Sequence, residues 1–543
     1  MPDKADVFDY VIVGGGSAGC VLAARLSEQS KVLLLEAGSD PAGVDQVMVP
    51  AALTRLFKTR FDWNYTTQPQ PDAGGRRVYW PRGRALGGSS AINAMIYIRG
   101  NRFDYDGWRD TYDCAGWGYR ELLPYFRRAE DNARGASAYH GAGGPLPVQD
   151  VQHKSAQTQA FVAAARHYGL PENPDFNGAS QEGVGFYQVT QRHGRRASVA
   201  DAYLRTPSPS LTIRTESLVT GIVVEGGRAA GVSYRQHGTE LTARAEAEVI
   251  LAAGAVNTPQ LLMLSGIGPA DELREAGIFV IVDNPAIGAN LIDHPAVPLV
   301  WATPGVRGLW EDGGNAGFIR WRLTRRGPLT SNLSEAGGFT RSAPDLHAPD
   351  LQWHVIPGPY LEEGLVDPAR RAVSILVTLV DVRSTGRIRL HSRDPRHRPL
   401  IDPGYFSDSR DVAALTEGVR ITREIAAAPP LAKIRTEEIS APSPDFVRQN
   451  VITLYHPVGT CAMGGDRPGV RPSAVDAELR VRGIQGLRVV DASVMPTVPR
   501  GNTNAPVIAI AERAADLIAG RAPLAAADPA DAADALAIAA GTG

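Results

Sequence analysis

The chain has 543 residues, too many for one hydrophobic core, so two or more domains are expected. A hydrophobic content of 43% and a charged content of 21% are typical of an ordinary globular protein. The formal net charge of −2 gives no global attraction to nucleic acid or anionic lipid. No apolar run reaches the length of a membrane span and the N-terminus lacks the apolar core of a secretion signal, so we expect a cytoplasmic location.

The first predicted unit is a βαβ dinucleotide-binding unit. Its pattern predicts a buried strand over 11–13, a helix over 18–27 and a second strand over 31–35. Between the first strand and the helix, Gly14, Gly16 and Gly19 have the spacing G-x-G-x-x-G, which permits a tight turn, close approach of a pyrophosphate and helix–strand packing. Glu36 ends the second strand, where a carboxylate can accept hydrogen bonds from an adenosine ribose. The unit alone is compatible with NAD or FAD.

A second glycine-rich loop follows in the run 81–108. Gly83, Gly87 and Gly88 precede Ser89 and lead into an apolar stretch that we predict to be helical. Small residues allow close approach to a flat ring or a phosphate, and Asn93 offers both a donor and an acceptor. Alone, this run is equally compatible with a surface loop. Beside the first unit, it is expected to be a further contact of an extended cofactor.

The middle of the chain is predicted to be rich in strands. Runs between 211 and 253 are separated by glycine turns, and the last of them, EVILAAG, repeats the apolar-strand design of the N-terminus. Its final residue, Gly254, precedes a predicted helix over 258–265, which places this strand in the same parallel sheet.

The region 297–450 has a different pattern. Strand-like runs such as 351–356 and 372–380 alternate with proline-rich loops and a predicted helix over 411–426, which favours an antiparallel sheet with helices on one face. We expect an α/β fold with a discontinuous Rossmann-like FAD-binding domain, 1–150, 198–296 and 451–522, and a substrate domain, 151–197 and 297–450. The Ala- and Asp-rich tail, 523–543, is expected to be disordered.

Four motifs carry a family resemblance. They are GRALGGSSAIN with Tyr97, Gly100 and Asp106 following, GAVNTPQLLMLSGIG from Gly254, YHPVGTCAMG from Tyr455, and VVDASVMPTVPRGNTNAPVIAIAE from Val489. In type, order and spread over the chain, they resemble the signatures of the glucose–methanol–choline oxidoreductases. The resemblance implies FAD rather than NAD and an alcohol as the usual substrate.

The resemblance also implies where the cofactor binds. Val219 is expected against the adenine and Trp63 near the cofactor, although core packing explains Trp63 nearly as well. Ile92 stands where some relatives carry a histidine bonded covalently to the flavin, so we expect dissociable FAD. The residues expected to bind FAD are Gly14, Gly16, Ser17, Ala18, Gly19, Glu36, Ala37, Trp63, Arg84, Leu86, Gly87, Gly88, Ser89, Asn93, Ala94, Met95, Ile96, Val219, Ala253, Gly254, Asp491, Ala492, Asn502, Thr503 and Asn504.

The predicted chemistry centres on His456 and Asn504. Hydride transfer from an alcohol carbon to flavin N5 requires the hydroxyl proton to leave, and an imidazole is suited to accept it near neutral pH. An amide can hold the alkoxide oxygen without competing for that proton. In the resembled family the two positions are a histidine followed by an asparagine or histidine, and His456 and Asn504 are assigned to them here.

The substrate is the least determined feature. Glu335 lies in SNLSEAGGF, a motif that resembles one of choline dehydrogenases, and could pair with a quaternary ammonium; a structural carboxylate is an equal alternative. Trp353, Leu454 and Tyr455 suggest a partly apolar pocket, which favours an uncharged primary alcohol over choline. A lyase or photodecarboxylase on the same fold is a second alternative. The electron acceptor could be oxygen, a quinone or a dye, and a dehydrogenase is slightly preferred over an oxidase. The protein could be a monomer or a dimer. The three distant cysteines indicate neither a disulfide framework nor a metal site.

Overall fold

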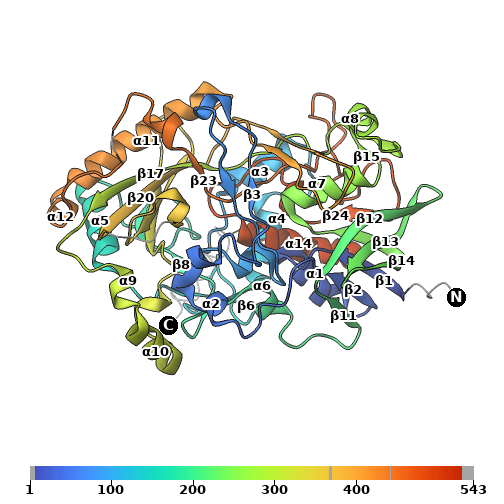
Figure 1. Ribbon diagram of the computed structural model, residues 1–543, viewed down its shortest axis with the longest axis horizontal. Coiled ribbons are helices and arrows are strands. Elements are labelled where there is room, and N and C mark those ends of the chain that lie inside the picture. The colour runs from blue at the N-terminus through green and yellow to red at the C-terminus, as the bar shows by residue number, and fades with distance from the viewer. Residues whose placement is uncertain (1–5, 366–369, 441, 529–543) are drawn as a thin grey trace, which may run out of the picture.

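A computed structural model describes residues 6–365, 370–440 and 442–528. Its first sheet has the strand order β11-β2-β1-β14-β13-β12, with β24 also paired to β14 (Figure 1). The strands are β1 (Asp6–Val13), β2 (Val32–Leu35), β11 (Leu211–Arg214), β12 (Ser217–Glu225), β13 (Arg228–Gln236), β14 (Thr239–Leu251) and β24 (Leu487–Val489). β1 is parallel to β2 and to β14. The prediction that EVILAAG joins the N-terminal parallel sheet is therefore confirmed.

Helices from both ends of the chain pack together on this sheet. α1 (Ser17–Leu26) contacts α14 (Asn504–Ile518), which in turn contacts α4 (Tyr119–Ala129). The fully buried Glu512 of α14 forms ion pairs with Arg25 at 2.9 Å and Arg128 at 2.7 Å, and it accepts a hydrogen bond from Tyr203. A buried carboxylate is tolerated when its charge is paired and hydrogen-bonded, so this cluster joins α1, α4 and α14.

The second sheet is antiparallel, with the order β23-β17-β20-β19-β18-β7. Its strands are β7 (Gly183–Phe186), β17 (Pro295–Ala302), β18 (Ala336–Thr340), β19 (Leu351–Ile356), β20 (Ala372–Leu379) and β23 (Ile452–Thr453). α5 (Ala156–Tyr168) and α11 (Ser409–Ala427) contact this sheet and each other, and Figure 1 shows both helices at the outer side of the molecule. The predicted antiparallel sheet with helices on one face is confirmed.

One predicted helix is absent. After a short 3₁₀ turn at Gly88–Ala91 the apolar stretch is irregular, and the next helix is α3 (Arg102–Asp110). Backbone groups of this stretch bond to a distant segment instead of to one another, since Tyr97 donates to the Gln188 carbonyl and Thr190 donates to the Met95 carbonyl. The prediction of a helix there was wrong because apolar character alone does not distinguish a helix from a buried extended segment.

The remaining elements are short and surround the two sheets. They are α2 (Asp45–Met48), β3 (Tyr65–Thr66), β4 (Tyr79–Trp80), β5 (Glu130–Asn132), β6 (Leu146–Asp150), β8 (Gln188–Val189), β9 (Gln191–Arg192), β10 (Arg195–Arg196), α6 (Val199–Tyr203), α7 (Gly254–Leu264), β15 (Ile267–Gly268), α8 (Ala270–Glu275), β16 (Val282–Asp283), α9 (Leu309–Asp312), α10 (Asn315–Thr324), β21 (Arg387–Arg389), β22 (Leu400–Asp402), α12 (Pro429–Ala432) and α13 (Phe446–Asn450).

The start of the predicted disordered tail lies on α4. The Leu524 amide donates to the Tyr125 hydroxyl at 3.0 Å, and the Ala527 amide donates to the Arg120 carbonyl at 2.9 Å. The rest of the tail, 529–543, lies outside the described residues. Within the described ranges no helix is both long and apolar enough to cross a bilayer.

Candidate functional site

A cavity of about 570 Å³ lies between the two sheets. Val13, Leu35 and Ala252, at the carboxyl ends of β1, β2 and β14, line one side, and residues of β19 and β20 line another. The carboxyl edge of a parallel sheet is where α/β proteins bind dinucleotides. The location therefore agrees with the predicted cofactor site.

The two glycine-rich loops meet backbone to backbone at this cavity. A Cβ on Gly88, whose φ is +53°, would lie 2.7 Å from Gly16 Cα, and the Gly87 amide donates to the Gly15 carbonyl. Gly14 has a φ of +103°, and a Cβ there would lie 2.6 Å from the Ala252 carbonyl oxygen. Larger residues at these positions would fill the space or strain the turn.

Three helices begin at the cavity wall, each with its positive end toward the cavity. α1 begins at Ser17, α7 at Gly254 and α14 at Asn504, and all three residues line the cavity. Unsatisfied amides and the helix dipole favour an anion at such positions. The wall therefore suits the pyrophosphate of a dinucleotide.

Two carboxylates hold this wall together. Glu36 accepts hydrogen bonds from the amides of Gly15 at 2.8 Å and Gly38 at 2.7 Å, and burial raises its pKa to about 7. Asp491 accepts from the Gly254 amide at 2.9 Å and from the Thr258 hydroxyl, and its pKa is also raised by burial. Both carboxylates line the cavity and fix the turns beside it.

Most of the residues predicted to bind FAD line the cavity, and three do not. Gly19, Leu86 and Gly87 are absent from its wall among the described residues. Gly19 has a packing role, since a Cβ there would lie 1.9 Å from the Gly14 carbonyl oxygen.

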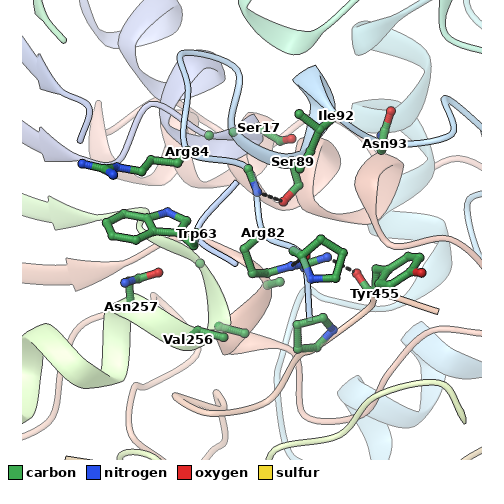
Figure 2. Close-up of a pocket in the computed structure, with 18 of the residues that line it drawn as sticks. Ser17, Trp63, Arg82, Arg84, Ser89, Ile92, Asn93, Val256, Asn257 and Tyr455 are labelled. Atoms are coloured by element: carbon green, nitrogen blue, oxygen red, sulfur yellow. Dashed lines mark hydrogen bonds between the residues drawn. The ribbon is translucent and has the colours of Figure 1, made fainter. Parts of the chain in front are cut away.

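Aromatic and cationic side chains form a separate part of the wall (Figure 2). The rings of Trp63 and Tyr65 are stacked with centroids 5.9 Å apart, and the Arg84 guanidinium lies 5.0 Å from the Trp63 ring centroid. Asn257 donates to the Tyr65 hydroxyl at 2.7 Å. Sequence reasoning identified Trp63 and Arg84 but missed Tyr65 and Asn257, although Tyr65 stands two residues after Trp63.

His456 is held at the cavity by its backbone. Its amide donates to Asp293 at 2.8 Å, and the same carboxylate accepts a hydrogen bond from the Thr453 hydroxyl at 2.6 Å. Arg82, which sequence reasoning missed, donates to the carbonyl of the preceding residue, Tyr455, as Figure 2 shows. Burial lowers the pKa of His456 well below its ordinary value, and His294, His354 and Arg82 lower it further. The imidazole is therefore neutral at neutral pH.

Both ring nitrogens of His456 have side-chain partners. Nδ1 lies 3.0 Å from His294 Nδ1, and Nε2 lies 3.3 Å from the amide nitrogen of Asn502. Gln352 donates to the amide oxygen of Asn502 at 3.2 Å, which turns the amide nitrogen toward the imidazole. An amide NH₂ only donates, so Nε2 accepts and the ring proton lies on Nδ1, shared with His294.

The predicted pairing of His456 with Asn504 is not the one that the structure makes. Asn504 accepts a hydrogen bond from the Ser17 hydroxyl at 2.7 Å, at the start of α14, while Asn502 faces His456. The motif GNTNAP contains both asparagines, and their spacing alone did not distinguish them. The correction follows from the turn before α14, which directs the two side chains to different partners.

Glu335 and Trp353, both predicted to contact the substrate, face away from the cavity. Glu335 is fully buried and accepts hydrogen bonds from the Ser155 amide and from the hydroxyls of Thr158 and Ser331. Trp353 is also fully buried, and its indole donates to Thr422 of α11. Each side chain packs on the helix side of the second sheet, which favours the alternative of a structural carboxylate for Glu335 and gives Trp353 a packing role.

Leu454 and Tyr455 do line the cavity, together with residues that sequence reasoning missed. These are Phe57, Leu333, His354, Ile356, Tyr360 and Leu376. Strand alternation could have indicated His354 and Ile356, because residues at a spacing of two share one face of β19. Of the described residues that line the cavity, only Glu36 and Asp491 carry carboxylates, and backbone amides engage both.

Known proteins are similar to this chain over most of its length. Family models described as GMC oxidoreductase match residues 8–296 and 382–511. The chain is 42% identical to "Alcohol dehydrogenase [acceptor]" of Pseudomonas putida, covering 96% of this chain and 97% of that protein. It is 41% identical to mitochondrial choline dehydrogenase of Homo sapiens, covering 96% and 91%. The crystal structure of pyridoxine 4-oxidase from Mesorbium loti is similar with a TM-score of 0.86, 35% identity and coverage of 96% and 100%.

Proposed function

The chain belongs to the GMC oxidoreductase family and is an FAD-dependent enzyme acting on CH–OH groups, and on this basis we propose that it oxidises an uncharged primary alcohol to the aldehyde. The observation that carries the proposal is the neutral, buried His456 with Asn502 at its Nε2, both lining the same cavity as the glycine loops.

The residues present fit FAD. A Cβ on Gly14 or Gly88 would collide with the backbone of Ala252 or Gly16, so glycine is what lets the two loops meet at the cavity, and the N-termini of α1 and α14 would hold the pyrophosphate. Glu36 lies where an adenosine ribose would be bound. FAD, when bound, supplies the acceptor for the hydride that leaves the alcohol carbon.

His456 and Asn502 would do the acid–base and positioning work. With its proton on Nδ1, His456 has its lone pair on Nε2, and an alcohol hydroxyl that takes the place of the Asn502 amide there would transfer its proton to this nitrogen. The amide NH₂ of Asn502 donates to the oxygen as negative charge develops on it, which also orients the carbon–hydrogen bond. Because the pKa of His456 is lowered, the residue is in its proton-accepting form before substrate arrives.

The cavity wall around His456 supports an uncharged substrate. Phe57, Leu333, Ile356, Leu376 and Leu454 make it largely apolar, and Glu335, the residue predicted to pair with an ammonium, is buried elsewhere. Choline is the second candidate, because a quaternary ammonium could lie against aromatic faces, and Phe57 and Tyr455 line the cavity with ring centroids 5.7 Å apart.

We further propose that FAD is bound without a covalent bond. Ile92 lines the cavity and packs with Val47, Phe61 and Ala85 in a small apolar cluster. An aliphatic side chain offers no nucleophile for attachment to the flavin. Precipitation of the holoenzyme with acid should leave the yellow colour in the supernatant, and a yellow pellet would contradict this.

A panel of alcohols under anaerobic conditions tests the proposed function. Medium-chain aliphatic alcohols or benzyl alcohol should bleach the visible absorption of the bound flavin faster than choline does. The reduced enzyme is then mixed with oxygen or with an artificial dye, and faster reoxidation by the dye would identify a dehydrogenase. If no alcohol of the panel bleaches the flavin, the result would contradict alcohol oxidation and favour a lyase or photodecarboxylase.

A further inference from the structure

α10 carries apolar side chains on two faces. On its inner face, Trp321 is fully buried, and it packs with Phe318 in the apolar cluster that includes Leu53 and Phe57 of the cavity wall. The Trp321 indole also donates to the Gly194 carbonyl at 2.7 Å. On its outer face, Ile319 is 59% exposed and Leu323, one turn later, is 80% exposed. The inner face packs the helix against the protein, and the exposed Ile319 and Leu323 lie outside that packing.

The same segment is strongly cationic. Between Gly313 and Gly327 the chain has four arginines, Arg320, Arg322, Arg325 and Arg326, and neither aspartate nor glutamate. Burial lowers the pKa of Arg325, and the nearby charges of Arg195 and Arg322 lower it further, while Asp45 acts in the opposite direction. Arg322 forms an ion pair with Asp45, whereas Arg320 and Arg326 are exposed. Although the formal net charge of the whole chain is −2, the segment between Gly313 and Gly327 is positively charged.

Figure 1 shows α9 and α10 protruding at the edge of the molecule, on the side of the second sheet. A protruding helix with exposed aliphatic side chains between arginines matches a bilayer surface, where the aliphatic groups enter the acyl region and the guanidinium groups reach anionic headgroups. We propose that the outer face of α10, with Ile319, Arg320 and Leu323, together with Arg326 just beyond the end of the helix, attaches this protein to the surface of an anionic lipid bilayer.

Charge favours a bilayer over a second copy of the chain. In a two-fold dimer through α10, each arginine-rich face would lie against the same face of the partner, and this juxtaposition of like charges is unfavourable. An anionic bilayer neutralises the arginines and accepts Ile319 and Leu323 at the same time. The attachment is peripheral, since α10 has only ten residues and no described helix could span a bilayer.

Vesicle sedimentation of the holoenzyme tests the proposal. The protein should sediment with vesicles of phosphatidylcholine and phosphatidylglycerol, and should remain in the supernatant with phosphatidylcholine alone or at high salt. Two variants probe the two contributions: Ile319→Glu with Leu323→Glu removes the apolar part, and Arg320→Glu with Arg326→Glu reverses the charges. Each pair should lower the partition coefficient of the protein between anionic vesicles and water about tenfold or more. For the arginine pair this follows from the contribution of about 1 kcal/mol that each arginine makes near an anionic surface, and for the apolar pair from the loss of aliphatic groups that enter the acyl region.

The matched control is Phe279→Glu, which changes an 84% exposed apolar residue four positions after the end of α8. Figure 1 shows α8 at the opposite side of the molecule from α10. This variant should leave vesicle binding unchanged. Circular dichroism and the visible flavin spectrum verify that each variant is folded. The proposal would be overturned if the native protein failed to sediment with anionic vesicles, or if both double variants bound these vesicles as well as the native protein does. Dimerisation in solution that the Ile319 and Leu323 changes abolish would overturn it as well.

Discussion

His294 Nδ1 lies 3.0 Å from His456 Nδ1, and the two rings are nearly perpendicular at 87°. One of two facing nitrogens must carry the proton, and the amide of Asn502 at His456 Nε2 places that proton on His456 Nδ1. His294 is therefore the acceptor that keeps the proton away from the cavity side of His456. This relationship defines His294 as a positioning residue for the proposed base.

His456→Ala should abolish most of the reaction while FAD stays bound. The rate constant of flavin reduction by alcohol should fall about 100- to 10,000-fold, because the hydroxyl proton loses its acceptor. Anaerobic stopped-flow absorbance measures the rate, and the protein-bound flavin spectrum measures cofactor content. A full rate in the variant would remove His456 from the mechanism.

Asn502→Ala and Asn504→Ala should differ. Loss of the Asn502 amide should slow flavin reduction about 100-fold, as expected when one donor to a developing oxyanion is removed. Loss of Asn504, whose oxygen accepts from Ser17, should instead weaken FAD binding and leave the reduction rate near that of the native enzyme. Ser17→Ala is the matched control and should resemble Asn504→Ala. The opposite ranking of the two asparagines would restore the assignment made from the sequence.

His294→Gln should reduce kcat/KM and change its pH profile. In the native enzyme the pKa of His456 lies well below 6.5, so the neutral base persists as the pH falls, and kcat/KM should decline only under strongly acidic conditions. The variant alters the group that faces the Nδ1 proton, and a poorly satisfied buried donor costs about 1–3 kcal/mol, which corresponds to about 5- to 150-fold in rate. A variant with the native rate and pH profile would show that His294 serves packing only.

Acid should destabilise the protein through its buried histidines. Burial lowers the pKa values of His294 and His354 to about 3, whereas an unfolded histidine binds a proton below about 6.5. Between these values the unfolded state binds more protons, so the free energy of unfolding should fall as the pH falls from about 6.5 toward about 3. Glu36 has the opposite effect, because its pKa is raised from 4.5 to about 7. Between these values the native state binds more protons at Glu36, so this residue raises the free energy of unfolding as the pH falls.

Thermal unfolding of the holoenzyme across this pH range measures the effect. His354→Gln should flatten the decline in melting temperature, since one proton-linked group is removed. His153→Gln is the control, because His153 is only partly buried and lies before α5. Equal slopes for the native protein and His354→Gln would contradict the linkage to this histidine.

Glu335→Ala should affect stability rather than substrate choice. Its carboxylate accepts from Ser155, Thr158 and Ser331, and leaving buried donors unsatisfied costs about 1–3 kcal/mol. The melting temperature should fall, while the ratio of kcat/KM for an aliphatic alcohol to that for choline should not change. A selective loss of choline activity would instead return Glu335 to the substrate site.

Local patterns were sufficient for much of the fold. The spacing of Gly14, Gly16 and Gly19 between two apolar runs predicts a strand, a turn and a helix, because each requirement is satisfied within a few residues. The same holds for the antiparallel strands β19 and β20. The sequence also singled out His456, because the motif around it, with Pro457 and Gly459, is a local pattern, and His456 lines the cavity.

Only the tertiary structure decided which side chains meet. Asn502 and Asn504 are equivalent as sequence, but the turn before α14 sends one to His456 and the other to Ser17. Trp353 and His354 are neighbours on β19, yet α11 covers the face of the first and the cavity lies on the face of the second. The sequence by itself determines the order and type of these elements, because those depend on short-range backbone preferences. The partners of His456 and the direction of Glu335 depend on contacts between residues distant in the chain, 46 positions for Asn502 with His456, 162 for His294 with His456 and 180 for Ser155 with Glu335, which no local pattern encodes.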